Sequence, residues 1–113
     1  MMDCIFCKII AGEIPSKKVY EDDTVYAFYD IAPQAPVHIL VIPKEHVLSS
    51  AREIGAEHGA LIAHIYEVMA RLASELGLEG GYRVVTNAGE DAGQTVLHLH
   101  FHMLAGGQLG AMA

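Results

Sequence analysis

Three histidines stand at alternate positions, His98, His100 and His102, within the segment GQTVLHLHFHML over residues 93–104. In a β-strand such residues share a face, so the three imidazoles are predicted to point one way and the apolar residues between them the other way. The outer two would lie roughly 13 Å apart, which makes binding of all three to one metal ion awkward. A neutral imidazole can instead attack phosphorus and carry a phosphoryl group as a covalent adduct.

A glycine-containing segment, NAGEDAGQT over residues 87–95, comes directly before the histidines. Gly89 and Gly93 allow close approach of the backbone, and Asn87, Gln94 and Thr95 add side-chain hydrogen-bond donors. Such a segment is often only a turn, and the histidine face on its own can be merely solvated. Their adjacency predicts an anion cradle beside a nucleophile.

The only two cysteines, Cys4 and Cys7, lie in the segment DCIFC. This C-x-x-C spacing lets two thiolates bind one tetrahedral zinc ion, but redox pairs share the spacing and it also arises by chance. Zinc would need two further ligands. Two part-buried free thiols are the alternative.

The chain has 113 residues, of which 52% are apolar, so it has room for one domain with one core. Apolar stretches such as HILVIP are far shorter than the roughly 20 residues that a membrane-spanning helix needs, so no membrane span is expected. The start MMDCIFCKII lacks the basic start and the long apolar core of a secretory signal, which predicts a cytoplasmic protein. In that reducing compartment the cysteines are expected as thiols or metal ligands.

Seven basic and fourteen acidic residues give a formal net charge of −7. This charge opposes binding to a nucleic acid duplex, so no such partner is expected. Backbone donors can still bind a single small anion.

The hydrophobic pattern predicts an α+β domain with a mostly antiparallel sheet and a helix on one face. Strands are expected on either side of the EDD turn in residues 17–31, and then over 37–43, 81–87 and 97–104. A long helix is expected from Ile54 onward, with Gly77 at its C-terminal cap.

The string HLHFHML resembles the signature of the histidine triad (HIT) family, in which three histidines alternate with apolar residues. Residues 7–46 and 87–102 are similar to the Hint branch, the histidine triad nucleotide-binding proteins, so that the resemblance covers nearly the whole chain. It implies a HIT-like fold as a single domain over residues 1–113, with five strands, one long helix, a short N-terminal helix and a short flexible tail at about 106–113. It also implies a homodimer in which the two sheets join into one.

The activity that this resemblance implies is hydrolysis of purine nucleoside 5′-phosphoramidates, such as adenosine 5′-monophosphoramidate, through a nucleotidyl-histidine intermediate. No cofactor is required for that chemistry. The alternatives are a nucleotide-binding interaction protein with incidental turnover, a dinucleotide polyphosphate hydrolase, and a small zinc protein whose histidines serve only the metal.

The resemblance also implies roles for particular residues. His100 matches the nucleophile, whose Nδ1–H is held by a backbone carbonyl, and Asp30 matches the carboxylate that binds the ribose. His102 matches the residue on the phosphate and leaving-group side, with His38 and His98 completing the set. The phosphate would be held by Asn87, Gly93, Gln94, Thr95 and Val96. The base pocket would comprise Ile5, Phe6, Ile9, Ile14, Phe28 and Ile31.

Some members of the wider superfamily bind structural zinc through a cysteine pair and two histidines, which match Cys4, Cys7, His46 and His98 here. If zinc is bound, His98 serves the metal and not the phosphate. Well-known relatives end in a tail with a tryptophan that shapes leaving-group preference, whereas this chain has no tryptophan. The resemblance therefore leaves the leaving group undefined.

Overall fold

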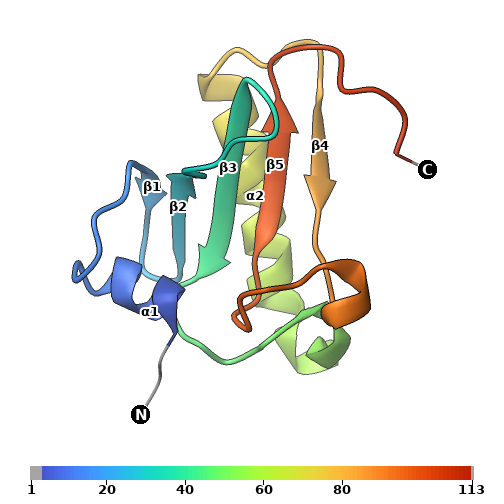
Figure 1. The fold of residues 1–113 in the computed structure, drawn as a ribbon. Helices are drawn as coiled ribbons and strands as arrows, with labels where there is room; N and C mark the ends of the chain where they lie inside the picture. Colours follow the sequence, from blue (N-terminus) through green and yellow to red (C-terminus); the bar gives the residue numbers. More distant parts are fainter. Residues whose placement is uncertain (1–3, 113) are drawn as a thin grey trace.

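The computed structural model describes residues 4–112, which form one antiparallel sheet with strand order β1-β2-β3-β5-β4. Figure 1 shows this sheet with a long helix behind it and a short helix at the N-terminal end. The strands are β1 (Lys18–Glu21), β2 (Val25–Tyr29), β3 (Val37–Pro43), β4 (Tyr82–Val85) and β5 (Phe101–Ala105), and the helices are α1 (Ile5–Ile10) and α2 (Gly59–Glu75). The predicted α+β architecture is confirmed.

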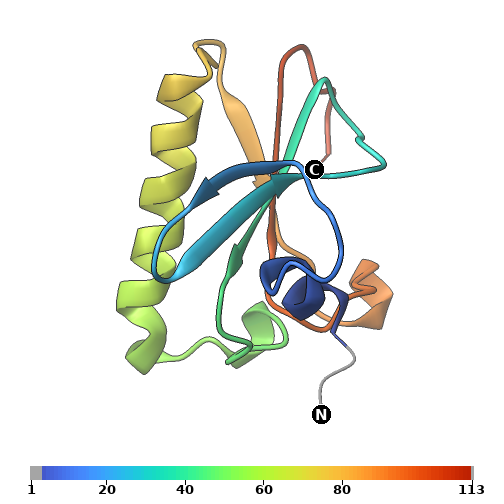
Figure 2. The same ribbon diagram turned by 90° about the vertical axis from the view of Figure 1, so that its left-hand side faces the viewer.

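Helix α2 packs on one face of the sheet, and α1 lies on the opposite face (Figure 2). The helix buries Ile65, Val68, Met69 and Leu72, which recur at the spacing of one helical face. Because α2 covers only one face, the other face is free to carry polar groups. No helix among residues 4–112 combines the length and apolar character needed to cross a bilayer.

The predicted end of α2 is confirmed, but its predicted start at Ile54 is wrong. Gly77 has φ +68°, and Leu78 N–H donates to the Ala73 carbonyl at 2.9 Å, as in a Schellman cap. At the other end Gly55 is extended, so the chain makes two short 3-10 turns, at Ala51–Glu53 and Ala56–His58, before the helix begins. The helix therefore starts at Gly59.

The predicted strand over residues 97–104 is also shorter than expected, since β5 begins at Phe101. Upstream of it, Leu99 N–H donates to the Leu48 carbonyl at 2.9 Å. Leu48 lies in a loop and not in the sheet. The predicted alternation nevertheless continues through this segment. Leu99, Phe101 and Met103 lie in the core under α2. The histidines between them face the side of α1, where Phe6 contacts two of the imidazole rings.

An ion pair joins the β1–β2 turn to α2. His64 Nε2 lies 2.6 Å from Asp22 Oδ2, and this contact raises the pKa of His64 above its ordinary 6.5. Burial alone would raise the pKa of Asp22, but hydrogen bonds led by the one from Tyr20 outweigh it and hold that pKa well below its usual range. Asp22 therefore stays ionised while His64 titrates.

We expect His64→Gln to lower the free energy of unfolding by about 0.5–1 kcal/mol near pH 6 and by less near pH 9. The contribution of His64 is complete below its unfolded pKa of 6.5 and is lost as the pH rises through the raised folded value. Urea unfolding at both pH values measures it, with His58→Gln as the control. An equal loss at both pH values would contradict the ion-pair explanation.

Candidate active site and Cys/His cluster

His100 is a buried imidazole whose tautomer is fixed by the backbone. Its Nδ1 lies 2.7 Å from the carbonyl oxygen of His98, and because a carbonyl only accepts, Nδ1 carries the proton. Burial lowers the pKa of His100, so the ring is neutral at pH 7. Phe6 packs edge-on against the ring at a centroid distance of 5.0 Å. No group within residues 4–112 hydrogen-bonds to Nε2, which therefore keeps its lone pair on a restrained ring.

His38 and His102 form a chain of hydrogen bonds with a defined direction. The backbone N–H of Gln34 donates to Nδ1 of His38 at 3.0 Å, so the proton of His38 is on Nε2. That Nε2 lies 2.9 Å from Nδ1 of His102, which accepts it. Burial, reinforced by the neighbouring imidazoles, lowers the pKa of His102 to about 4. His102 is therefore neutral and carries its proton on Nε2, where it is available to a ligand.

Asp30 lies at the outer end of this chain. Its Oδ1 accepts a hydrogen bond from the backbone N–H of Ala32 at 2.7 Å, and its Oδ2 lies 3.5 Å from Nε2 of His38. The carboxylate faces a cavity of about 790 Å³ that is also lined by Lys17 and Ile31. A metal ion could fit between Asp30, His38 and His102, whose potential ligand atoms lie close together. However, Nε2 of His38 and Nδ1 of His102 already share a hydrogen bond with each other.

The loop before the histidines has the glycine geometry of a tight turn, with φ +93° at Gly89 and +90° at Gly93. Gln94 has a different role from the one expected. Its side-chain amide donates to the carbonyls of Ser49 and Val96 at 2.6 and 3.0 Å, and its oxygen accepts from Gly89 N–H. The expected side-chain donors of Gln94 are therefore spent on bracing the loop.

Two backbone N–H groups of this loop have no hydrogen-bond acceptor among the described residues. Within residues 4–112, the N–H groups of Thr95 and Val96 donate no hydrogen bond, and the Asn87 side chain lines a second cavity together with His102. These are the groups of the expected phosphate set that are available to an anion.

The six apolar residues expected around a base divide by exposure. Phe6, Ile9 and Phe28 are buried in one cluster, against which Ile14 packs, so they have a core role without any ligand. Ile5 is 46% exposed and Ile31 is 97% exposed. Ile31 contributes to no core and lines the large cavity beside Asp30, where an apolar ligand surface would cover it.

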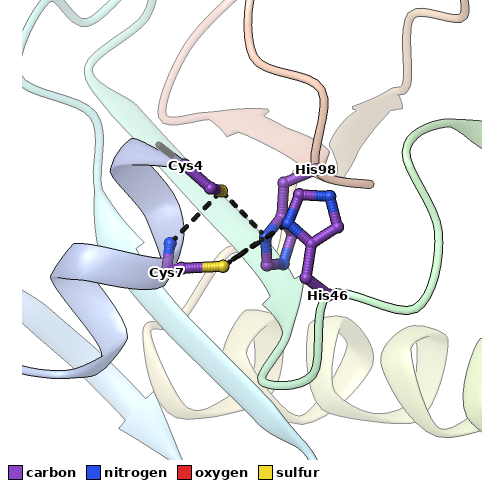
Figure 3. A group of neighbouring side chains, drawn as sticks. All are labelled: Cys4, Cys7, His46 and His98. Carbon is purple, nitrogen blue, oxygen red and sulfur yellow. Dashed lines mark hydrogen bonds between the residues drawn. The ribbon is translucent and has the colours of Figure 1, made fainter. Parts of the chain in front are cut away.

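A second cluster brings together Cys4, Cys7, His46 and His98, whose potential ligand atoms all lie within 4.8 Å of one another. Figure 3 shows both sulfurs, from the start of α1, facing the two imidazoles. Nδ1 of His98 lies 3.3 Å from Cys4 Sγ and 3.6 Å from Cys7 Sγ, and Nδ1 of His46 lies 3.4 Å from Cys7 Sγ. Tetrahedral zinc with ordinary bond lengths puts sulfur and nitrogen donors about 3.6 Å apart.

The protonation pattern of this cluster also fits a metal. Nε2 of His98 lies 2.8 Å from the carbonyl of Pro43 and carries the proton, so the lone pair of Nδ1 points at the sulfurs. Burial, together with Cys4, raises the pKa of the Cys7 thiol to about 11. A bound cation would reverse that shift by stabilising the thiolate. The donor set of two sulfurs and two imidazoles is one that zinc accepts.

The structure thus gives the three alternate histidines three different environments. The side chain of His98 is fully buried in the Cys/His cluster, and its carbonyl contacts Nδ1 of His100. His100 offers a free Nε2, and His102 ends the donor chain. Sequence reasoning missed the main-chain partners, such as the carbonyl of Pro43 and the N–H of Gln34, because every residue carries a carbonyl and every residue except proline carries an N–H.

Comparison with known proteins identifies the family of this chain. The sequence model of the HIT domain matches residues 11–109. The chain belongs to the HIT family. It is 53% identical over 107 residues to a HIT-like protein of Synechococcus elongatus, covering 95% of this chain and 93% of that one. It is 45% identical over 111 residues to the purine nucleoside phosphoramidase of Escherichia coli K12, covering 97% and 92%.

Among solved structures, the chain superimposes on a HIT family hydrolase from Clostridium thermocellum with a TM-score of 0.93 and 46% identity. That match covers 99% of this chain and 97% of the other. The family resemblance and the HIT fold are therefore confirmed. At this coarse level the protein is a HIT family hydrolase.

Proposed function

We propose that this HIT protein hydrolyses purine nucleoside 5′-phosphoramidates through a nucleotidyl intermediate on His100. The observation that carries the proposal is the 2.7 Å contact between His100 Nδ1 and the His98 carbonyl, which leaves Nε2 as a neutral nucleophile. The phosphoramidase activity of the E. coli relative, at 45% identity, supports the choice of substrate class.

In the proposed reaction Nε2 of His100 forms a bond to the α-phosphorus as the phosphorus–nitrogen bond of the substrate breaks. The leaving nitrogen takes a proton through the donor chain that ends at Nε2 of His102. Water then attacks the phosphorus, the bond to His100 breaks, and the proton of the water returns to the chain. The products are the nucleoside monophosphate and an amine.

Release of AMP from adenosine 5′-monophosphoramidate, measured with and without a chelator, tests this function. We expect rapid release that the chelator does not change. AMP binding without release would indicate the nucleotide-binding protein, and release lost with the metal would indicate a metal-dependent site. A dinucleotide polyphosphate, assayed in parallel, is expected to be a poorer substrate.

Asp30 is proposed to bind the ribose hydroxyls, because its carboxylate lies beside the reacting imidazoles and faces the large cavity. We expect Asp30→Ala to weaken AMP binding by about 1.5–3 kcal/mol, the range for hydrogen bonds to a charged group. Turnover at saturating substrate is expected to survive. Calorimetric titration with AMP measures the change, with Asp23→Ala as the control for loss of one carboxylate. Equal affinities of wild type and Asp30→Ala would reject this role.

We also propose that Cys4, Cys7, His46 and His98 hold a structural zinc ion. The support is the donor geometry described above. Zinc there would link α1 to the segment that carries the histidines and would contribute directly to folding. It has no proposed contact with the substrate phosphate.

A homodimer is proposed in which the β4 edges pair and the α2 helices pack together. Within residues 4–112, strand β4 pairs with β5 alone, so its outer edge carries unpaired backbone groups. Exposed aromatic residues lie nearby, since Tyr82 on β4 is 39% exposed and Tyr66 on α2 is 47% exposed. Sedimentation is expected to give twice the mass of the chain, and a single-chain mass would reject the dimer.

A further inference from the structure

A second cavity, of about 320 Å³, lies between the donor chain and the C-terminal segment. His38 lines both this cavity and the larger one that contains Asp30, whereas His102 lines only the smaller cavity. The leaving nitrogen of the proposed reaction takes its proton at Nε2 of His102. Its substituent is therefore expected to extend into the second cavity, away from the ribose.

The walls of this cavity are built by β4, β5 and the tail. Val85 is opposite His102 in the β4–β5 register, and Arg83 is opposite Leu104, so these side chains share the face of the imidazole. Leu109 and Met112 of the tail cover the apolar side. In Figure 1 this C-terminal segment, in red, descends beside β4.

Arg83 holds the tail against the cavity. Its guanidinium donates to the carbonyl of Leu109 at 3.5 Å and to the carbonyl of Gly110. These two bonds use part of the five N–H donors of the guanidinium. Because both acceptors are neutral carbonyls, they leave its positive charge unpaired. No aspartate or glutamate within residues 4–112 forms an ion pair with Arg83.

The two cavities differ in charge. The larger one contains a carboxylate and an ammonium, Asp30 and Lys17. The smaller one is lined by apolar and amide side chains, by neutral imidazoles and by Arg83, its only formally charged residue. A ligand in the smaller cavity meets one uncompensated positive charge beside an apolar wall. Arginine binds a carboxylate with charge-assisted hydrogen bonds and repels an ammonium.

We propose that the second cavity is a leaving-group site that selects amines bearing a carboxylate, with Arg83 as the specificity-determining residue. The preferred substrates are nucleoside 5′-phosphoramidates in which the nitrogen belongs to a small amino acid. The volume of about 320 Å³ suits a substituent of a few heavy atoms. This inference rests on the proposed function, because it assigns the substituent of the amine that the reaction releases.

Three adenosine 5′-phosphoramidates of similar size test the inference, with glycine, glycinamide and mono-protonated ethylenediamine as the amine. For wild type we expect kcat/KM to be about tenfold higher for the carboxylate than for the carboxamide, and lowest for the ammonium. Arg83→Met should remove the preference and Arg83→Lys should retain most of it. Arg71→Met, which removes an exposed arginine on α2, should leave the preference intact.

The unsubstituted phosphoramidate, as a fourth substrate, distinguishes failure of the proposed function from failure of the leaving-group inference. If wild type hydrolyses none of the four compounds, the proposed function fails. If it hydrolyses them without preferring the carboxylate, or if Arg83→Met keeps the preference, only the leaving-group inference is overturned. A wild-type measurement covers the case in which Arg83→Met does not fold. The preference should shrink as ionic strength rises, and a salt-independent preference would overturn the role of charge.

Discussion

Replacing His100 with alanine or asparagine is expected to abolish turnover and to leave AMP binding largely intact. The change removes the attacking nitrogen but keeps the loop amides and the carboxylate that are proposed to hold the nucleotide. Loss of a nucleophile is expected to cost several powers of ten in rate, each worth about 1.4 kcal/mol of barrier. Steady-state assay with adenosine 5′-monophosphoramidate, together with calorimetric titration with AMP, measures both effects.

His64→Gln is the matched control, because it removes an imidazole from α2, the helix on the opposite face of the sheet from α1, and is expected to keep the wild-type rate. His100→Asn keeps a polar side chain and leaves a smaller cavity than alanine. A loss of rate in both variants therefore does not come from the cavity alone. A near-wild-type rate in either His100 variant would show that another group attacks phosphorus.

Cys4→Ser is expected to lose zinc and several kcal/mol of folding free energy together, because metal-binding free energy in a structural site is also folding free energy. Wild type purified without chelator should contain about one zinc per chain by elemental analysis. The activation barrier should rise by less than the free energy of unfolding falls, since the cluster contacts His100, the proposed nucleophile, through the carbonyl of His98.

Serine is an informative replacement at this position. Cys4 Sγ accepts the backbone N–H of Cys7 at 3.3 Å as the N-cap of α1, and a serine hydroxyl can do the same. A loss of stability that appears in zinc-supplemented protein and not in metal-free protein therefore reports the metal and not the cap or the packing of Cys4. His64→Gln, which lies on α2 and outside the cluster, should keep the metal. Metal-free wild type whose thermal stability equals that of zinc-supplemented protein would identify Cys4 and Cys7 as ordinary thiols.

The sheet and the face of the histidines could be predicted because both depend on side-chain periodicity. The alternation of His98, His100 and His102 with apolar residues decides which groups enter the core, even where the regular strand has not yet begun. The start of β5 could not be predicted in this way. It depends on where β3 offers partners, and those end at Val41, which pairs with Phe101.

The chemical differences among the three histidines were not accessible from their spacing. They arise from groups that fold in from elsewhere, namely the Pro43 carbonyl beside His98 and the Gln34 amide that orders the chain to His102. Gln94 illustrates the same limit. A glutamine in a glycine-rich loop suggests a donor to a ligand, but its amide is used by two backbone groups of the loop and by the distant carbonyl of Ser49.

The family resemblance identified which residues gather, and it left the leaving group undefined. Arg83 has no motif around it, and its significance depends on the return of the tail to β4, which brings the carbonyls of Leu109 and Gly110 to its guanidinium. Contacts of this kind follow from tertiary structure and have no local signature.

The most direct test of the account is a search for the covalent intermediate on His100. Wild-type protein mixed with adenosine 5′-monophosphoramidate, quenched in acid-free denaturant within milliseconds and analysed by intact-mass spectrometry, is expected to gain the mass of one adenylyl group. Peptide mapping should locate that group on His100, and His100→Asn should show no gain. AMP release by wild type with no adduct at any quench time, and undiminished release by His100→Asn, would contradict nucleophilic catalysis by this histidine.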